Sequence, residues 1–279
     1  MKTYKPTTPS RRAMSTVTYR GVLTTNDPHK PLTKGFRRGS GRNAYGRITA
    51  GHKGGGHKRS YRDIDFSYNK IGIPAKVQTV EYDPNRSGFI GLVAYNDGEK
   101  RYVLLPKSVT VGSTFIVGDE APLEPGNRTI LKNIPVGTFV YNIEIKTKGG
   151  AKLARSAGVY AQVVAHDGGF TSIKLPSTEI RKVPDTCSAC IGEVSNEEFR
   201  LRNLGKAGRS RHLGRRPSVR GKAMNPVDHP YGGGEGSQPR GTRYPKTKYG
   251  KVTGGHKTRT PKKYSNVHIV SRRKTGKNK

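Results

Sequence analysis

The segment TFVYNIEIK (138–146) alternates mostly polar residues with apolar ones at Phe139, Tyr141, Ile143 and Ile145. A period of two residues is typical of a β-strand with one face buried in a core. Other β-rich runs are 75–82, 88–95, 101–105, 113–117, 159–165, 171–175 and 179–183. Between them lie the turn sequences DPNRSG, NDGEK, HDGG and LPST. Short strands at this spacing predict an all-β fold of small barrels or sandwiches.

A Pro- and Gly-rich stretch at 118–137 divides the strand-rich region in two. We therefore predict four parts: a basic, Gly-rich extension (1–60), two small β-domains (61–120 and 121–200) and a basic C-terminal extension (201–279). Ser195 and Glu198 have the spacing of a capping box and predict one short helix over 199–204, closed by Gly205. No internal repeat stands out.

Charge is distributed very unevenly along the 279 residues, whose net charge is +34. Residues 1–60 hold 14 Lys or Arg and one acidic residue, and residues 201–279 hold 22 Lys or Arg and two acidic residues. The middle of the chain, 61–200, holds 17 Lys or Arg and 16 acidic residues and is nearly neutral. Solubilising surface charge is usually mixed in sign, so this separation favours basic segments that bind a polyanion.

The polyanion could be nucleic acid, an anionic membrane surface or an acidic polysaccharide. No run approaches the 18 apolar residues of a membrane span, and MKTYKPTTPSRRAMS lacks the apolar core of a secretory signal. Composition alone leaves an organellar transit peptide open. Two cysteines in this length do not make a disulfide scaffold, so we expect a cytosolic protein.

The basic extensions combine glycine, lysine, arginine and isolated tyrosines, as RNA-binding segments do. We expect them to be disordered alone and ordered when bound. The candidate contacts of the first region are Arg47, His52, Lys53, His57, Lys58, Arg59 and Arg62. Those of the second region are Arg209, Arg211, Arg215, Arg216, Arg220, Lys222, Asn225 and His229.

Two motifs resemble chemical sites but lack essential parts. Cys187 and Cys190 form a single CxxC without the second ligand pair of a structural zinc site, which favours two ordinary thiols. The segment GGGHK (54–58) is Gly-rich but does not match the P-loop pattern. We therefore expect neither a metal site nor a nucleotide cofactor.

The segment AMNPVDHPYGGGEG (223–236) is a shaped loop, because prolines fix the backbone on one side and glycines free it on the other. Asp228 could orient the adjacent His229 as a general base. No Ser or Cys nucleophile is placed nearby, and adjacent side chains rarely form such a pair. Recognition is therefore the favoured role, with catalysis by Asp228 and His229 as the weaker alternative.

Several segments resemble the bacterial type of the large-subunit ribosomal protein two family, and together they span nearly the whole chain. They are YKPTTPSRR (4–12), GRNAYGRITAGHKGGGHKRSYRDIDF (41–66), EYDPNRSGFIGLVAYNDGEKRYVLLP (81–106), NIPVGTFVYNIEI (133–145), GGAKLARSAGVYAQVVA (149–165) and MNPVDHPYGGGEG (224–236). The last segment, MNPVDHPYGGGEG, is the most specific match to the family. Tyr231 stands where many bacterial members have His, and Cys190 where a hydroxyl residue is expected.

The resemblance implies an OB-fold followed by an SH3-like barrel. It implies a scaffold protein in the cytoplasmic ribosome that binds large-subunit rRNA and supports subunit association, tRNA binding and peptidyl transfer, whose chemistry belongs to the rRNA. The implied partners are rRNA, other ribosomal proteins, the small subunit and tRNA, with no membrane and no cofactor beyond Mg²⁺ shared with rRNA. Two alternatives remain: an enzyme using Asp228 and His229, and a general polyanion binder.

Overall fold

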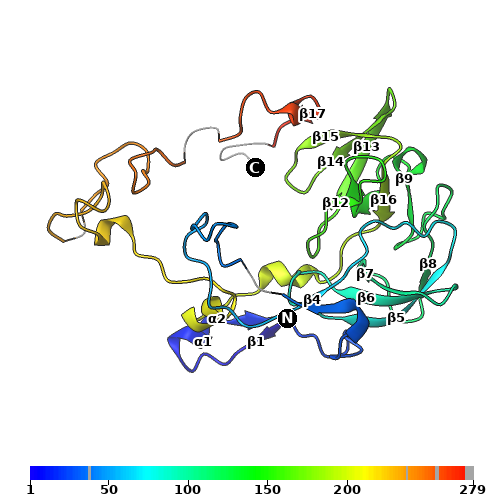
Figure 1. Cartoon of the computed structure of the whole chain (residues 1–279), viewed down its shortest axis with the longest axis horizontal. Helices are drawn as coiled ribbons and strands as arrows, with labels where there is room; N and C mark the ends of the chain where they lie inside the picture. The colour runs from blue at the N-terminus through cyan, green and yellow to red at the C-terminus, as the bar shows by residue number, and fades with distance from the viewer. Residues whose placement is uncertain (37–38, 237, 255–257, 274–279) are drawn as a thin grey trace. The chain divides into compact units, whose positions relative to one another are not determined.

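The computed structural model describes residues 1–36, 39–236, 238–254 and 258–273 (Figure 1). The chain forms two compact units. We call the first the β-unit; it consists of Met1–Arg37, Lys58–Lys206 and Ser265–Lys279. The second, the basic unit, consists of Arg38–His57 and Ala207–Tyr264. Each segment of the basic unit therefore leaves the β-unit and returns to it along the chain, whereas the sequence suggested two terminal extensions.

The predicted all-β class is confirmed, because strands and curled sheets dominate the structure. In the described residues the α-helices are α1 (Pro9–Arg12) and α2 (Ala207–His212). Short 3₁₀ turns occur at Lys30–Leu32, Leu131–Asn133, Glu197–Leu201, Gly221–Ala223 and Tyr264–Asn266. Within this part of the chain, no helix has the length and apolar character needed to cross a membrane.

A four-stranded antiparallel sheet is the first large element of the β-unit. Its strands lie in the order β7 (Lys100–Leu104), β6 (Ile90–Tyr95), β5 (Ala75–Glu81) and β8 (Thr114–Phe115). The NDGEK turn joins β6 to β7, with Gly98 at φ +86° and the Tyr95 N–H bonded to the Glu99 carbonyl at 3.0 Å. The inward side chains, among them Val77, Val93 and Val103, form one apolar core.

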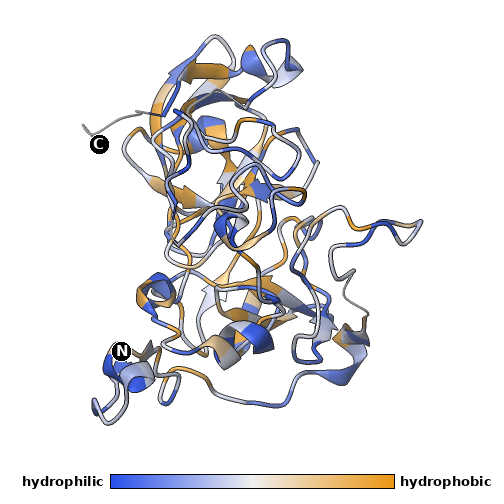
Figure 2. Ribbon diagram, turned by 90° about the vertical axis from the view of Figure 1, so that its left-hand side faces the viewer, coloured by the Kyte–Doolittle hydropathy of each residue, from blue (hydrophilic) through white to orange (hydrophobic). Residues whose placement is uncertain are grey.

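A seven-stranded antiparallel sheet is the second large element of the β-unit. Its strands lie in the order β17 (Ile269–Ser271), β15 (Ile180–Pro184), β14 (Phe170–Lys174), β13 (Ala161–Asp167), β10 (Phe139–Tyr141), β16 (Ser188–Ile191) and β9 (Arg128–Ile130). The apolar core formed with this sheet includes Ile173 of β14 together with Leu131 and Ile134, which follow β9. Figure 2 shows that apolar residues concentrate along the strands of the sheets.

Three two-stranded pairs complete the β structure. They are β1 (Lys2–Thr3) with β2 (Ser15–Thr16), β3 (Thr33–Gly35) with β4 (Ser60–Arg62), and β11 (Ile143–Glu144) with β12 (Ala151–Leu153). Parts of both predicted extensions therefore belong to the β-unit, since β1 to β3 precede residue 60 and β17 follows residue 201.

The predicted continuous strand over 138–146 is wrong in one respect. Asn142 adopts φ +50°, in the left-handed region, and divides the segment into β10 and β11. Burial also departs from the expected alternation: Phe139 is exposed, whereas Val140 is fully buried. The side chain of Asn142 donates to the Tyr68 hydroxyl at 2.8 Å, and this tertiary contact accompanies the local break.

A buried polar network lies beside Asn142, centred on Arg128, which is 1% exposed. Its guanidinium donates from Nη2 to Glu144 Oε1 at 2.9 Å and from Nη1 to the Asn142 carbonyl at 2.8 Å. The guanidinium also lies over the Tyr68 ring, 4.5 Å from its centroid. These contacts join Tyr68, from the segment that precedes β5, to strands β9 and β11.

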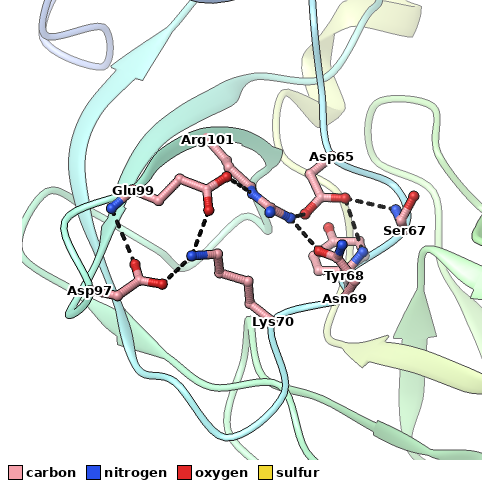
Figure 3. Close-up of polar contacts among 8 residues, drawn as sticks. All are labelled: Asp65, Ser67, Tyr68, Asn69, Lys70, Asp97, Glu99 and Arg101. Atoms are coloured by element: carbon pink, nitrogen blue, oxygen red, sulfur yellow. Dashed lines mark hydrogen bonds and ion pairs between the residues drawn. The ribbon is translucent and has the colours of Figure 1, made fainter.

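A second charged cluster of the β-unit holds the segment before β5 against the β6–β7 turn (Figure 3). Arg101 donates from Nη1 to Asp65 Oδ2 at 2.7 Å and from Nε to Glu99 Oε1 at 2.6 Å. Lys70 pairs with Asp97 and, at 2.5 Å, with Glu99. Acids and bases of the near-neutral middle of the chain thus neutralise one another within the β-unit.

Both cysteines are buried free thiols, one on and one next to strand β16 of the seven-stranded sheet. Cys190 lies on β16 and accepts a hydrogen bond from Arg128 Nη1 at 3.5 Å, while Cys187 directly precedes the strand. Burial raises the pKa of the Cys187 thiol to about 11. No group of three or more His, Cys, Asp or Glu that could hold a metal occurs among the described residues.

The capping box predicted at Ser195 and Glu198 is wrong. The Ser195 hydroxyl is buried and accepts a hydrogen bond from the Phe89 N–H at 3.0 Å. The helix is a 3₁₀ turn at Glu197–Leu201, and the residue before it, Asn196, is in the left-handed region at φ +64°. A tertiary partner on another segment has therefore displaced the local cap.

Candidate nucleic-acid interface

The basic unit holds a large share of the positive charge of the chain. Its 78 residues include 19 Lys or Arg against two acids, Asp228 and Glu235. None of its described residues has a buried hydrophobic side chain; the buried core belongs to the β-unit. Without an apolar core, little offsets the conformational entropy and charge repulsion of this unit. A polyanion that neutralised the cations would stabilise it.

Backbone pairing brings the two segments of the basic unit side by side, although 149 residues separate them in sequence. The N–H of Gly54 donates to the Gly214 carbonyl at 2.9 Å, and that of His57 to the His212 carbonyl at 2.9 Å. The His52 ring Nδ1 lies 2.9 Å from the Pro217 carbonyl. The sequence predicts two separate RNA-contact regions, one in each basic extension, whereas the structure pairs residues of the two regions with each other.

The pairing places most of the predicted contact residues in one unit. Lys53 and Arg215 form an antiparallel bridge, and the N–H of Arg216 donates to the His52 carbonyl at 3.0 Å. The predicted residues in the basic unit are Arg47, His52, Lys53, His57, Arg209, Arg211, Arg215, Arg216, Arg220, Lys222, Asn225 and His229.

The other three predicted residues, Lys58, Arg59 and Arg62, belong to the β-unit. Arg59 donates from Nη1 to the Pro84 carbonyl at 2.5 Å. Arg62 is only 8% exposed, with Nη1 3.9 Å from the buried Asp83 carboxylate. Arg62 thus has a structural role within its own unit.

Two arginines of the β-unit that the sequence did not single out share one aromatic contact. Both Arg86 and Arg155 place their guanidinium groups against the Phe66 ring, 5.4 and 4.5 Å from its centroid. Arg86 also pairs with Asp83 at 2.6 Å. Distant parts of the chain supply these side chains, so their clustering has no local sequence signal.

The loop 223–236 is held by its own backbone. The N–H groups of Asp228 and Gly233 donate to the carbonyls of Asn225 and Met224, at 3.0 and 3.1 Å. At Gly232 a Cβ would lie 2.2 Å from the Asn225 carbonyl oxygen, so only glycine fits there. The predicted shaped loop is therefore an ordered turn with close backbone packing.

The geometry of His229 does not match a general base oriented by Asp228. Its Nδ1 accepts a hydrogen bond from the Tyr231 N–H at 3.1 Å, which places the proton of the neutral ring on Nε2. Gly221 packs against the same ring, where a Cβ would lie 2.5 Å from Cε1. Asp228 is exposed and contributes its backbone N–H to the turn. The imidazole is therefore held as part of the loop.

Tyr231 joins the loop to the segment 242–246. Its ring lies 4.9 Å from the His229 ring, and its hydroxyl accepts a hydrogen bond from the Lys246 N–H. The hydroxyl also lies 3.3 Å from both the Thr242 hydroxyl and the Tyr244 carbonyl. A histidine at this position would have no phenolic oxygen for these contacts.

Two family models match this chain. The RNA-binding N-terminal domain of ribosomal proteins L2 matches residues 29–117, and the C-terminal domain of ribosomal proteins L2 matches residues 124–250. Together the matches cover most of the chain, including the first segment of the basic unit, the second segment as far as residue 250, and the shaped loop. The chain therefore belongs to the family of ribosomal L2 proteins, which are structural, rRNA-binding components of the ribosome and not enzymes in themselves.

Proposed function

We propose that this chain is a primary rRNA-binding constituent of the large ribosomal subunit, and that its basic unit inserts between rRNA elements. The observation that carries the proposal is the high charge density of a unit that lacks an apolar core: its net charge is +17 over 78 residues, the same as that of the 201-residue β-unit. The β-unit has the apolar core and pairs many of its own charges, whereas the basic unit has 19 cations and no buried hydrophobic side chain among its described residues.

This division suits a scaffold protein. The β-unit can fold around its own core, while the basic unit gains stability when phosphates neutralise it. Glycines such as Gly54 and Gly214 let the two segments of the basic unit pair closely through their backbones. We propose Mg²⁺ at this interface only as ions shared with rRNA phosphates.

We assign the shaped loop to the neighbourhood of the peptidyl transferase centre of the ribosome. Its tip residue Val227 is 97% exposed, on a turn whose backbone is fixed on both sides. A rigid, exposed turn within a basic unit suits contact with folded RNA. We propose that the loop supports assembly of the peptidyl transferase centre and tRNA binding, and that His229 acts through loop shape. Subunit association and contacts with other ribosomal proteins belong to the same proposal.

Salt dependence of rRNA binding tests the insertion of the basic unit. If the protein neutralises about 10 phosphates, log K falls with log salt at a slope of about −7 to −9. The measurement is filter binding of the full chain to large-subunit rRNA over a range of salt concentrations. A slope near −2, with about two or three phosphates neutralised, contradicts insertion of the basic unit.

Replacing Gly232 with alanine tests the role of the loop shape. The new Cβ overlaps the backbone carbonyls of Asn225 and Met224, so the loop must open. We expect rRNA affinity to fall about 10-fold, equivalent to about 1.4 kcal/mol. Gly208→Ala is the matched control, because Gly208 lies in α2 with open space around it. Equal affinities of the two variants would show that the loop shape does not contribute to binding.

A further inference from the structure

The basic unit contains two copies of one small hairpin, spanning 42–48 and 246–252. The sequences are RNAYGRI and KTKYGKV: a cation, a polar residue, any residue, Tyr-Gly, a second cation and a β-branched aliphatic residue. A threonine follows in each copy. The structure thus corrects the expectation of no internal repeat. The repeat is hard to recognise in the sequence because it is short and its residues are chemically similar more often than identical.

Equivalent hydrogen bonds form in both copies. An antiparallel bridge joins Arg42 to Ile48 in the first hairpin and Lys246 to Val252 in the second. The turn bond runs from the Gly46 N–H to the Asn43 carbonyl at 3.0 Å, and from the Gly250 N–H to the Thr247 carbonyl at 2.9 Å.

The threonine after each hairpin is also bound in the same way. Thr49 donates from its backbone N–H and from Oγ1 to the Gly41 carbonyl, at 2.8 and 3.2 Å. Thr253 donates from the same two groups to the Pro245 carbonyl, at 2.6 and 3.2 Å. The two segments therefore share a backbone structure as well as a sequence pattern.

Each hairpin presents a tyrosine at its tip. Gly46 and Gly250 have φ of +75° and +76°, so each closes a three-residue loop in the conformation that favours glycine. The preceding tyrosines, Tyr45 and Tyr249, are 89% and 76% exposed. A fixed backbone thus holds an aromatic ring outward at both tips.

The charge around both tips is of one sign. Arg42 and Arg47 flank the first tyrosine, and Lys246 and Lys251 flank the second. No acidic residue occurs between Asp27 and Asp63, or after Glu235. An exposed ring between two cations matches the surface that binds unpaired nucleotides, where the ring stacks on a base and the cations contact phosphates.

We propose that the two hairpins are equivalent binding elements, and that Tyr45 and Tyr249 each stack on an unpaired base of rRNA. The proposal rests on the proposed function and adds the substrate class of this part of the basic unit. An aromatic side chain stacks on any base, so the two hairpins can bind different RNA sequences with one geometry.

Tryptophan fluorescence tests the proposal directly, because the chain contains no tryptophan. Tyr45→Trp and Tyr249→Trp each place a single fluorophore at one tip. We expect large-subunit rRNA to quench both, since stacking on a base brings the indole against the nucleobase. Tyr160→Trp in the β-unit, where Tyr160 is 42% exposed, is the control and should respond less.

Affinity measurements on the full chain complete the test. Tyr45→Ala and Tyr249→Ala should each weaken rRNA binding about 5- to 150-fold, the range for one stacked base, whereas the Phe variants should bind normally. The salt slope should not change, because no cation is lost. A chain that fails to bind rRNA overturns the proposed function. If the chain binds rRNA normally but neither tryptophan is quenched, or only one of the two is quenched, the hairpin proposal alone is overturned.

Discussion

Replacing Arg128 with methionine is expected to lower the free energy of unfolding by about 3–5 kcal/mol. The guanidinium is fully buried and neutralises Glu144, which is itself 3% exposed. Methionine fills part of the volume but leaves the carboxylate without its counter-charge. It also removes the donor to the Asn142 carbonyl. An uncompensated buried charge and an unpaired buried carbonyl are both costly.

Urea denaturation of the full chain measures this effect. Lys34→Met is the control, because the Lys34–Asp63 pair is exposed on both sides and should contribute about 1 kcal/mol or less. The double variant Arg128→Met/Glu144→Leu should be more stable than Arg128→Met alone, since it removes the orphaned carboxylate. Equal stability of Arg128→Met and Lys34→Met would contradict the role assigned to the buried network.

Neutralising six cations of the basic unit is expected to weaken rRNA binding by on the order of 10³-fold. The variant replaces Arg209, Arg211, Arg215, Arg216, Arg220 and Lys222 with glutamine. Each lost phosphate contact lowers the magnitude of the salt slope by about 0.7–0.9, so the slope should fall by about 4–5. The effect should be similar across RNA sequences, because phosphate contacts carry no sequence information.

A control variant replaces exposed lysines of the β-unit in the same way: Lys76, Lys100, Lys132, Lys152 and Lys174. It removes a similar charge from the unit that is not assigned to insertion. We expect a much smaller change in affinity and slope. Comparable losses in the two variants would mean that net charge, and not the basic unit, governs binding.

The sequence predicts those features that depend on composition and short-range patterning. The β-rich runs 88–95 and 101–105, with NDGEK between them, become β6 and β7 because strand propensity and turn chemistry agree there. The basic character of both regions and the constrained loop around Gly232 are likewise readable from residue types. Each of these features has its cause within a few residues of the position it describes.

Features that depend on distant partners are not readable in this way. Asn142 breaks its strand while its side chain binds Tyr68, 74 residues away, and Ser195 binds Phe89 instead of capping a helix. The pairing of His52 with Pro217 also joins segments far apart in the chain. Local patterns cannot specify such contacts, because the tertiary partner overrides the local preference.

Competition binding at near-physiological salt tests the central claim most directly. Labelled domains of large-subunit rRNA are bound to the full chain and challenged with excess unrelated duplex DNA. Specific recognition predicts that one rRNA domain stays bound, and that replacing Lys53, Arg215 and Arg216 of the basic unit releases it. Complete displacement by the DNA would contradict the account, because the basic unit would then act as generic positive charge.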